Sequence, residues 1–160
     1  MTDPDERPRR TDETEHERLD RELEQLVNEM RLAMPGVQVL FAFLLAVPFA
    51  PGFKDVGPFG RDVYVFSVVC AALSCAFMIA PTAYHRIMFR RGDKSHLIKL
   101  ASAMTITGLA FLGLAMNAAI FLATDAVLDQ TQAIVITSVT ALVFLVLWFG
   151  LAAARRLRGA

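Results

Sequence analysis

The stretch VYVFSVVCAALSCAFMIAPTAY, residues 63–84, contains no Asp, Glu, Lys or Arg and decides the fold of this chain. Roughly 20 helical residues cross a hydrocarbon core about 30 Å thick, so this run is predicted to be a transmembrane helix. Three further apolar stretches accompany it, at residues 35–50, 97–123 and 133–154. The first of these is short and lies between Pro35 and Pro48. We therefore expect it either to cross with little tilt or to be extended by the helix that precedes it.

The composition of the whole chain agrees with a membrane protein. The 160 residues are 55% hydrophobic and have a mean hydropathy of +0.46, which is too apolar for an ordinary soluble domain. A formal net charge of zero argues against a nucleic-acid-binding protein, and the acidic residues before the first span argue against a cleaved signal peptide. We predict an all-α protein in which residues 35–154 form a four-helix transmembrane bundle.

The chain before residue 35 is hydrophilic and divides into two parts. Residues 1–13 are rich in charge and are predicted to be a disordered tail. Residues 14–34 are predicted to form an amphipathic cytoplasmic helix, because Thr14 and Glu17 have capping-box spacing and an apolar stripe follows: Leu19, Leu23, Leu26, Met30 and Ala33. This stripe suits either a coiled coil or partner helix, or a helix lying on the membrane surface or on the protein's own cytoplasmic end. Since only two heptads are present, we favour the second interpretation.

Lysine and arginine are divided unevenly between the two sides of the predicted bundle. Eleven lie near span ends on the side of the chain termini, including the basic tail 155–160, and two lie on the other side, Lys54 and Arg61. The positive-inside rule then places both termini in the cytoplasm. Residues 1–34 hold six basic and eleven acidic residues, whereas residues 35–160 hold ten and five. We therefore expect the amphipathic helix to fold back toward the basic segments 86–99 or 155–158.

Asp, Glu, Lys and Arg are absent from the interior of all four predicted spans. Proton- or sodium-coupled transport usually requires a carboxylate within the membrane, so this absence argues against an antiporter. The polar side chains in or beside the spans are candidates for function or for packing: Gln38, Ser67, Ser74, His85, Arg86 and Asn117. We expect Asn117 to face the bundle interior or a subunit interface near Ser67 or Thr137, because an unpartnered amide in lipid is costly. Its role is either a structural hydrogen bond, which we favour, or a substrate contact.

Helical periodicity separates two faces within residues 63–84. One face carries small or weakly polar side chains and ends at a histidine: Ser67, Ala71, Ser74, Met78, Pro81 and His85. Phe66, Leu73 and Phe77 occupy the other face. The small face is predicted to pack against other helices and the Phe/Leu face to meet lipid. Cys70 and Cys75 point apart on this helix and are interpreted as packing residues.

A basic connection follows this span, and its charges are Arg86, Arg90, Arg91, Lys94 and Lys99. These residues suit anionic lipid headgroups, although the orientation of the protein also explains them. His85 is either a pH-sensitive group, since an unperturbed imidazole titrates near ~6.5, or an anchor at headgroup level, which we favour. The sequence contains no nucleophile–base pair, phosphate-binding loop, dinucleotide fingerprint or metal-spaced His/Cys set, so we expect no catalytic residue, metal or cofactor.

Two motifs, MPGVQVLFAFLL at residues 34–45 and IAPTAYHRIMF at residues 79–89, resemble a family of small uncharacterised four-span membrane proteins found widely in actinobacteria. The resemblance covers residues 20–155, and some members carry an automatic sodium/proton antiporter label. It implies a bacterial inner-membrane location and supplies no catalytic residues. It makes Gln38, Pro81, His85 and Arg86 the first positions to test.

Two functional hypotheses follow from these patterns. The first is a multi-pass membrane protein of unknown molecular function that is not an enzyme and acts through assembly, either with a second copy or with another membrane protein. The amphipathic stripe and the small-residue faces favour it. The second is a small oligomeric cation or proton transporter or channel, which the few polar groups within the spans favour.

Overall fold

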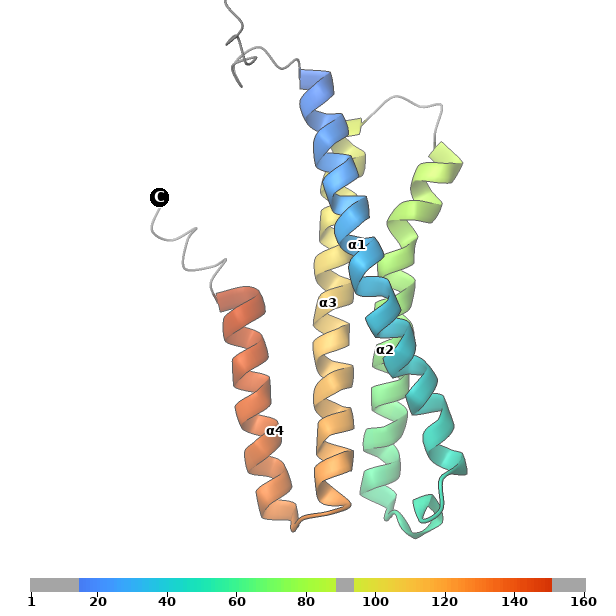
Figure 1. The fold of residues 1–160 in the computed structure, drawn as a ribbon, viewed down its shortest axis with the longest axis vertical. Helices are drawn as coiled ribbons and strands as arrows, with labels where there is room; N and C mark the ends of the chain where they lie inside the picture. The colour runs from blue at the N-terminus through green and yellow to red at the C-terminus, as the bar shows by residue number, and fades with distance from the viewer. Residues whose placement is uncertain (1–14, 89–93, 151–160) are drawn as a thin grey trace, which may run out of the picture.

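A computed structural model describes residues 15–88 and 94–150, and these two ranges are helical throughout apart from short turns (Figure 1). The long helices are α1 (Glu15–Ala46), α2 (Pro58–Met88), α3 (Lys94–Asp125) and α4 (Gln130–Leu145). Two 3₁₀ turns, η1 (Val47–Phe49) and η2 (Phe53–Asp55), join α1 to α2, and a π-helical turn, η3 (Val146–Gly150), continues α4. The predicted tails 1–13 and 155–160 lie outside the described residues.

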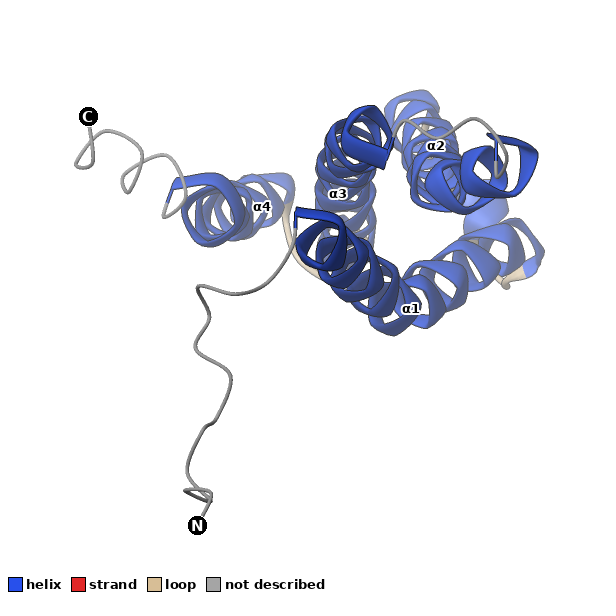
Figure 2. Cartoon of the chain, turned by 90° about the horizontal axis from the view of Figure 1, so that it is seen from above, coloured by secondary structure: helices blue, strands red, loops and turns tan. Residues whose placement is uncertain are grey.

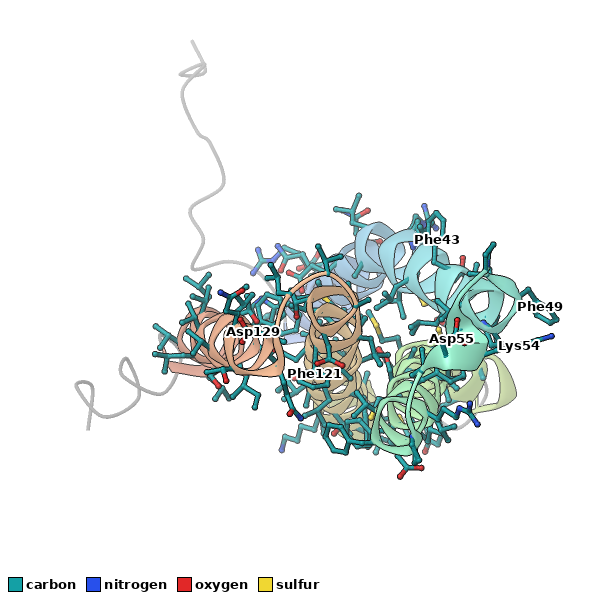
Figure 3. All side chains as sticks on the ribbon, turned by 90° about the horizontal axis from the view of Figure 1, so that it is seen from below. Phe43, Phe49, Lys54, Asp55, Phe121 and Asp129 are labelled. Carbon is teal, nitrogen blue, oxygen red and sulfur yellow. The ribbon has the colours of Figure 1, made fainter. Side chains whose placement is uncertain are left out.

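Each long helix contains a segment long and apolar enough to cross a membrane. These segments are Arg31–Phe49, Pro58–Tyr84, Lys99–Asp125 and Gln130–Trp148. Large apolar side chains project outward from them, and Figure 3 shows Phe43 of α1 and Phe49 of η1 pointing outward, where they are 69% and 89% exposed. The all-α class and the four membrane-competent helices predicted from sequence are therefore confirmed.

The predicted amphipathic helix and the first span form one continuous helix, α1. Pro35 lies inside it and cannot donate to the carbonyl of Arg31, yet the helix continues on both sides. The first span is thus extended by the helix that precedes it, one of the two arrangements expected. The amphipathic character of α1 stays a prediction, because the side chains that define most of the stripe lie outside those described: Leu19, Leu23, Leu26 and Met30.

The helices do not close into a four-helix bundle. Helices α1, α2 and α3 pack on one another, whereas α4 contacts α3 and no other long helix among the described residues. Seen from above, α4 stands to one side of the other three (Figure 2). Only Ala133 of α4 is buried, so nearly the whole surface of this helix is available to lipid. Contact with lipid stabilises a helix that is apolar on all sides about as much as contact with a second helix does. The sequence of α4 therefore does not determine which helices it packs against.

The connections define two ends of the molecule, which we name after residues that lie there. Helix α2 finishes and α3 begins at the Met88 end, and both the α1–α2 and the α3–α4 connections lie at the Asp129 end (Figure 1). At the Asp129 end, the Arg61 guanidinium donates from Nε to the Val56 carbonyl and from Nη2 to the Lys54 carbonyl, both at 2.9 Å. Arg61 thereby ties η2 and the residues after it to the start of α2.

Candidate functional site

The small face of α2 is buried against the neighbouring helices. Its described members have little or no exposed surface, and Ser67, Ala71 and Ser74 have none. Phe66 and Leu73 on the opposite face are 50% and 37% exposed. The predicted division of this helix into a packing face and an outward face is confirmed for these residues. Phe77, predicted to lie on the outward face with Phe66 and Leu73, is instead half-buried and stacks on Phe111 of α3. The side chain of His85 lies outside those described.

Ser67 and Ser74 use their hydroxyl groups differently. Ser67 Oγ donates to the Ala115 carbonyl at 2.9 Å, which joins α2 to α3. Ser74 Oγ lies 3.9 Å from Met78 Sδ on its own helix, a contact to a weak sulfur acceptor. Both hydroxyl groups therefore point inward, and neither is free to meet a ligand from outside the helix pair.

Gly108 of α3 allows α2 to approach closely beside Ser74. A Cβ at this position would lie 2.8 Å from Met78 Cγ and 3.4 Å from both Phe77 Cβ and the Ser74 carbonyl oxygen. No side chain fits there without movement, so the absence of a Cβ sets the distance between the two helices. Nearby, Phe77 stacks on Phe111 with ring centroids 5.7 Å apart.

The second polar contact joins α3 to α4 through Asn117. Asn117 Nδ2 donates to the Gly113 carbonyl one turn earlier at 2.9 Å, and its Oδ1 accepts from Thr140 Oγ1 at 3.1 Å. Thr140 also contacts the Thr137 carbonyl at 3.0 Å, so its single hydroxyl hydrogen is shared between two acceptors. The carboxamide has two N–H groups and two lone pairs, so the bonds to described residues leave one of each unused.

Sequence reasoning named Thr137 and Ser67 as neighbours of Asn117, and the structure corrects both. Thr140, one helical turn beyond Thr137, makes the contact from α4, and Ser67 bonds to Ala115 instead. The hydroxyl of Thr137 is buried without a hydrogen-bond partner among the described residues. Residues three apart share a helix face, so the spacing of Thr137 and Thr140 could have brought Thr140 into consideration.

An aromatic contact lies beside this polar pair. Trp148 of η3 stacks on Phe144 with ring centroids 5.2 Å apart, and a Cβ on Gly113 would lie 3.5 Å from Trp148 Cζ3. Gly113 and Asn117 thus form the part of α3 that α4 and η3 contact.

The remaining candidates lie apart from this cluster. The side chain of Gln38 is exposed on α1, and that of Lys99 is exposed near the start of α3. The side chains of the other basic candidates lie outside those described: Arg86, Arg90, Arg91 and Lys94. Any contact that α1 makes with them therefore also lies outside the described residues. Cys70 and Cys75 are free thiols, with Cys70 buried in the core, as expected of packing residues.

The cluster around Asn117 can make hydrogen bonds but cannot carry a proton. Carboxamide and hydroxyl side chains do not ionise near neutral pH, so Asn117, Thr137 and Thr140 offer neutral donors and acceptors only. No group of three or more His, Cys, Asp or Glu side chains that could hold a metal is found in the part of the chain that the structure describes. The arrangement suits the joining of helices or contact with a neutral polar group.

Comparison with known proteins places the chain in a family. Residues 12–152 match a family of unknown function designated DUF6328. The chain belongs to this family. No curated protein and no solved structure matches it. The resemblance to an uncharacterised family is thereby confirmed, and DUF6328 contributes no assigned activity or site to the residues described above. The actinobacterial origin and the antiporter label remain predictions.

Proposed function

We propose that this DUF6328 protein is a non-catalytic, multi-pass protein of a bacterial inner membrane that acts through assembly with a second copy or another membrane protein. Both termini lie in the cytoplasm, as the distribution of Lys and Arg favours. The lipid bilayer is its immediate partner, and anionic headgroups suit the basic connection between α2 and α3.

One observation carries this proposal: neutral side chains hold the helices together, and the interior of the spans contains no Asp, Glu, Lys or Arg. Ser67 bonds to α3 and Asn117 bonds to α4, so the polar side chains at these contacts act between helices. A group that binds and releases a coupling ion normally carries a charge within the membrane. The chemistry of these spans therefore supports assembly over ion-coupled transport.

The alternative is a small oligomeric cation or proton transporter or channel. It is supported by two sets of polar groups: the buried hydroxyl of Thr137, which has no hydrogen-bond partner among the described residues, and the N–H and lone pair that Asn117 does not use in its two bonds. Together these groups would provide a neutral polar contact within the hydrocarbon.

Purified protein in liposomes separates the two functions. We expect proton, sodium and potassium fluxes equal to those of empty vesicles, in both the natural protein and Asn117→Leu. A flux in the natural protein that falls in Asn117→Leu or in His85→Ala would overturn assembly as the function and establish transport. Leu142→Ala, on the exposed surface of α4, is the matched control for a nonspecific leak.

A further inference from the structure

The side chain of Gln38 is exposed in the middle part of a membrane-competent helix. It lies within the Arg31–Phe49 segment of α1 and makes no hydrogen bond with another described residue. Asn117, a carboxamide near the middle of another span, has partners for both its nitrogen and its oxygen. The described residues therefore leave two donors and the acceptor oxygen of Gln38 unused.

The depth of Gln38 follows from the packing of α1. Leu44 lies in a buried cluster with Cys70, Ala71 and Ala115, and residue 71 is the midpoint of the Pro58–Tyr84 segment of α2. Gln38 is six residues from Leu44, which is about 9 Å along a helix and less in depth because α1 is tilted (Figure 1). The hydrocarbon extends about 15 Å on each side of the midplane. The amide therefore lies in hydrocarbon, where an unpartnered amide costs several kcal/mol.

The exposed surface of α1 is divided into two lines at helical spacing. Leu32, Val39 and Phe43 form one line, and they are 75%, 55% and 69% exposed, as suits lipid contact. The other line, about 100° around the helix from the first, holds Pro35, Gln38 and Ala42 and continues to Leu45, and all four are exposed. The small side chain of Ala42, next to the Gln38 amide, lets another helix come close. The large side chains of Leu32, Val39 and Phe43, which we call the bulky line, do not.

We propose that Gln38 forms a two-fold contact with Gln38 of a second copy of this chain, and that the line of Pro35, Gln38 and Ala42 is the interface. Every copy inserted in the same orientation places Gln38 at the same depth. A carboxamide donates through nitrogen and accepts through oxygen, so two copies related by a two-fold axis satisfy each other with reciprocal bonds. A foreign helix would need its own carboxamide at that depth. The contact deepens the proposed function, since it names a partner and a surface for assembly.

Energy transfer between labelled copies of the full-length protein in liposomes tests the contact. Lowering the protein-to-lipid ratio separates dimers into monomers. Gln38→Leu should raise, by about tenfold, the protein-to-lipid ratio at which half of the protein is dimeric. Phe43→Leu, a similar change on the bulky line, should leave it unchanged. If the natural protein is monomeric at every ratio, or if Gln38→Leu associates as the natural protein does, the contact is wrong. Helix content by circular dichroism confirms that both variants are folded.

Disulfide crosslinking tests the geometry independently. In a background with Cys70→Ala and Cys75→Ala, we expect Ala42→Cys to form a disulfide dimer and Val39→Cys to stay monomeric. The reverse pattern would place the bulky line at the interface and overturn the proposal. If neither experiment detects the Gln38 contact and the liposomes show no ion flux, the proposed function stands as assembly with another membrane protein. If dimers form through Gln38 and the liposomes also show ion flux, the contact is supported and the proposed function is overturned.

Discussion

At the scale of single residues, glycine positions within the spans differ sharply in what surrounds them. Gly108 faces backbone and Cβ atoms of α2 within 3.4 Å, whereas Gly36 on α1 has no atom within 4 Å of the position that a Cβ would take. In the sequence, both are glycines within apolar helical segments. Only the helix crossing distinguishes them, so the importance of Gly108 could not be predicted from composition or periodicity.

Gly108→Ala should therefore destabilise the protein and Gly36→Ala should not. The added methyl group must push α2 away or displace Met78, at a cost of about 1–3 kcal/mol, while alanine at position 36 gains about 0.5–1 kcal/mol of helix propensity. Equilibrium unfolding in mixed micelles, followed by circular dichroism, measures the difference. Equal stability of the two variants would contradict the close approach at Gly108.

The two threonines of α4 provide a second matched pair. Thr140→Val removes the hydroxyl that donates to Asn117 and should cost about 0.6 kcal/mol, the mean for such bonds between membrane helices. Thr137→Val removes a buried hydroxyl without a partner and should be neutral or stabilising. The same unfolding measurement applies. A larger loss for Thr137→Val than for Thr140→Val would mean that Thr137, as sequence reasoning expected, makes the contact.

At the scale of elements, the sequence predicts that each helix exists better than it predicts where the helix ends and which helices it packs against. Apolar length predicts four spans because the bilayer sets that length. The joining of residues 14–34 to the first span could not be decided, because Pro35 is compatible with either a helix boundary or a continued helix. The packing face of α2 could be predicted, since small and large side chains alternate at helical spacing. The position of α4 could not, since its apolar residues surround the helix.

Helix α4 should separate from the protein before the other helices do. It contacts only α3 among the long helices that the structure describes, and the sole tryptophan of the chain, Trp148, lies at that contact. Trp148 fluorescence should change at a lower denaturant concentration than helix content does.

The control for this experiment moves the tryptophan. In a variant with Trp148→Phe and Phe111→Trp, the fluorophore lies in the α2–α3 contact where Phe77 stacks on Phe111. Its fluorescence should change together with helix content. Coincident transitions for Trp148 itself would instead indicate that α4 unfolds as one unit with α1, α2 and α3.

At the scale of the whole molecule, the net charge of zero conceals a division between an acidic segment, 1–34, and a basic remainder. The structure joins part of the acidic segment to the first span as one continuous helix, and α1 lies beside α3 near the Met88 end (Figures 1 and 2). The expectation that this helix contacts the basic connection depends on side chains that lie outside those described. The placement of Lys and Arg on the two sides of the spans still predicts the orientation of the molecule in the membrane.

The account as a whole depends on four crossings with the α2–α3 connection in the cytoplasm. Labelling of single cysteines in intact cells with an impermeant thiol reagent tests this most directly, in a background with Cys70→Ala and Cys75→Ala. We predict that Gly57→Cys reacts from outside, and that Gly92→Cys reacts only after the membrane is permeabilised. Labelling of Gly92→Cys in intact cells, with Gly57→Cys protected, would contradict the orientation and the positive-inside argument behind it.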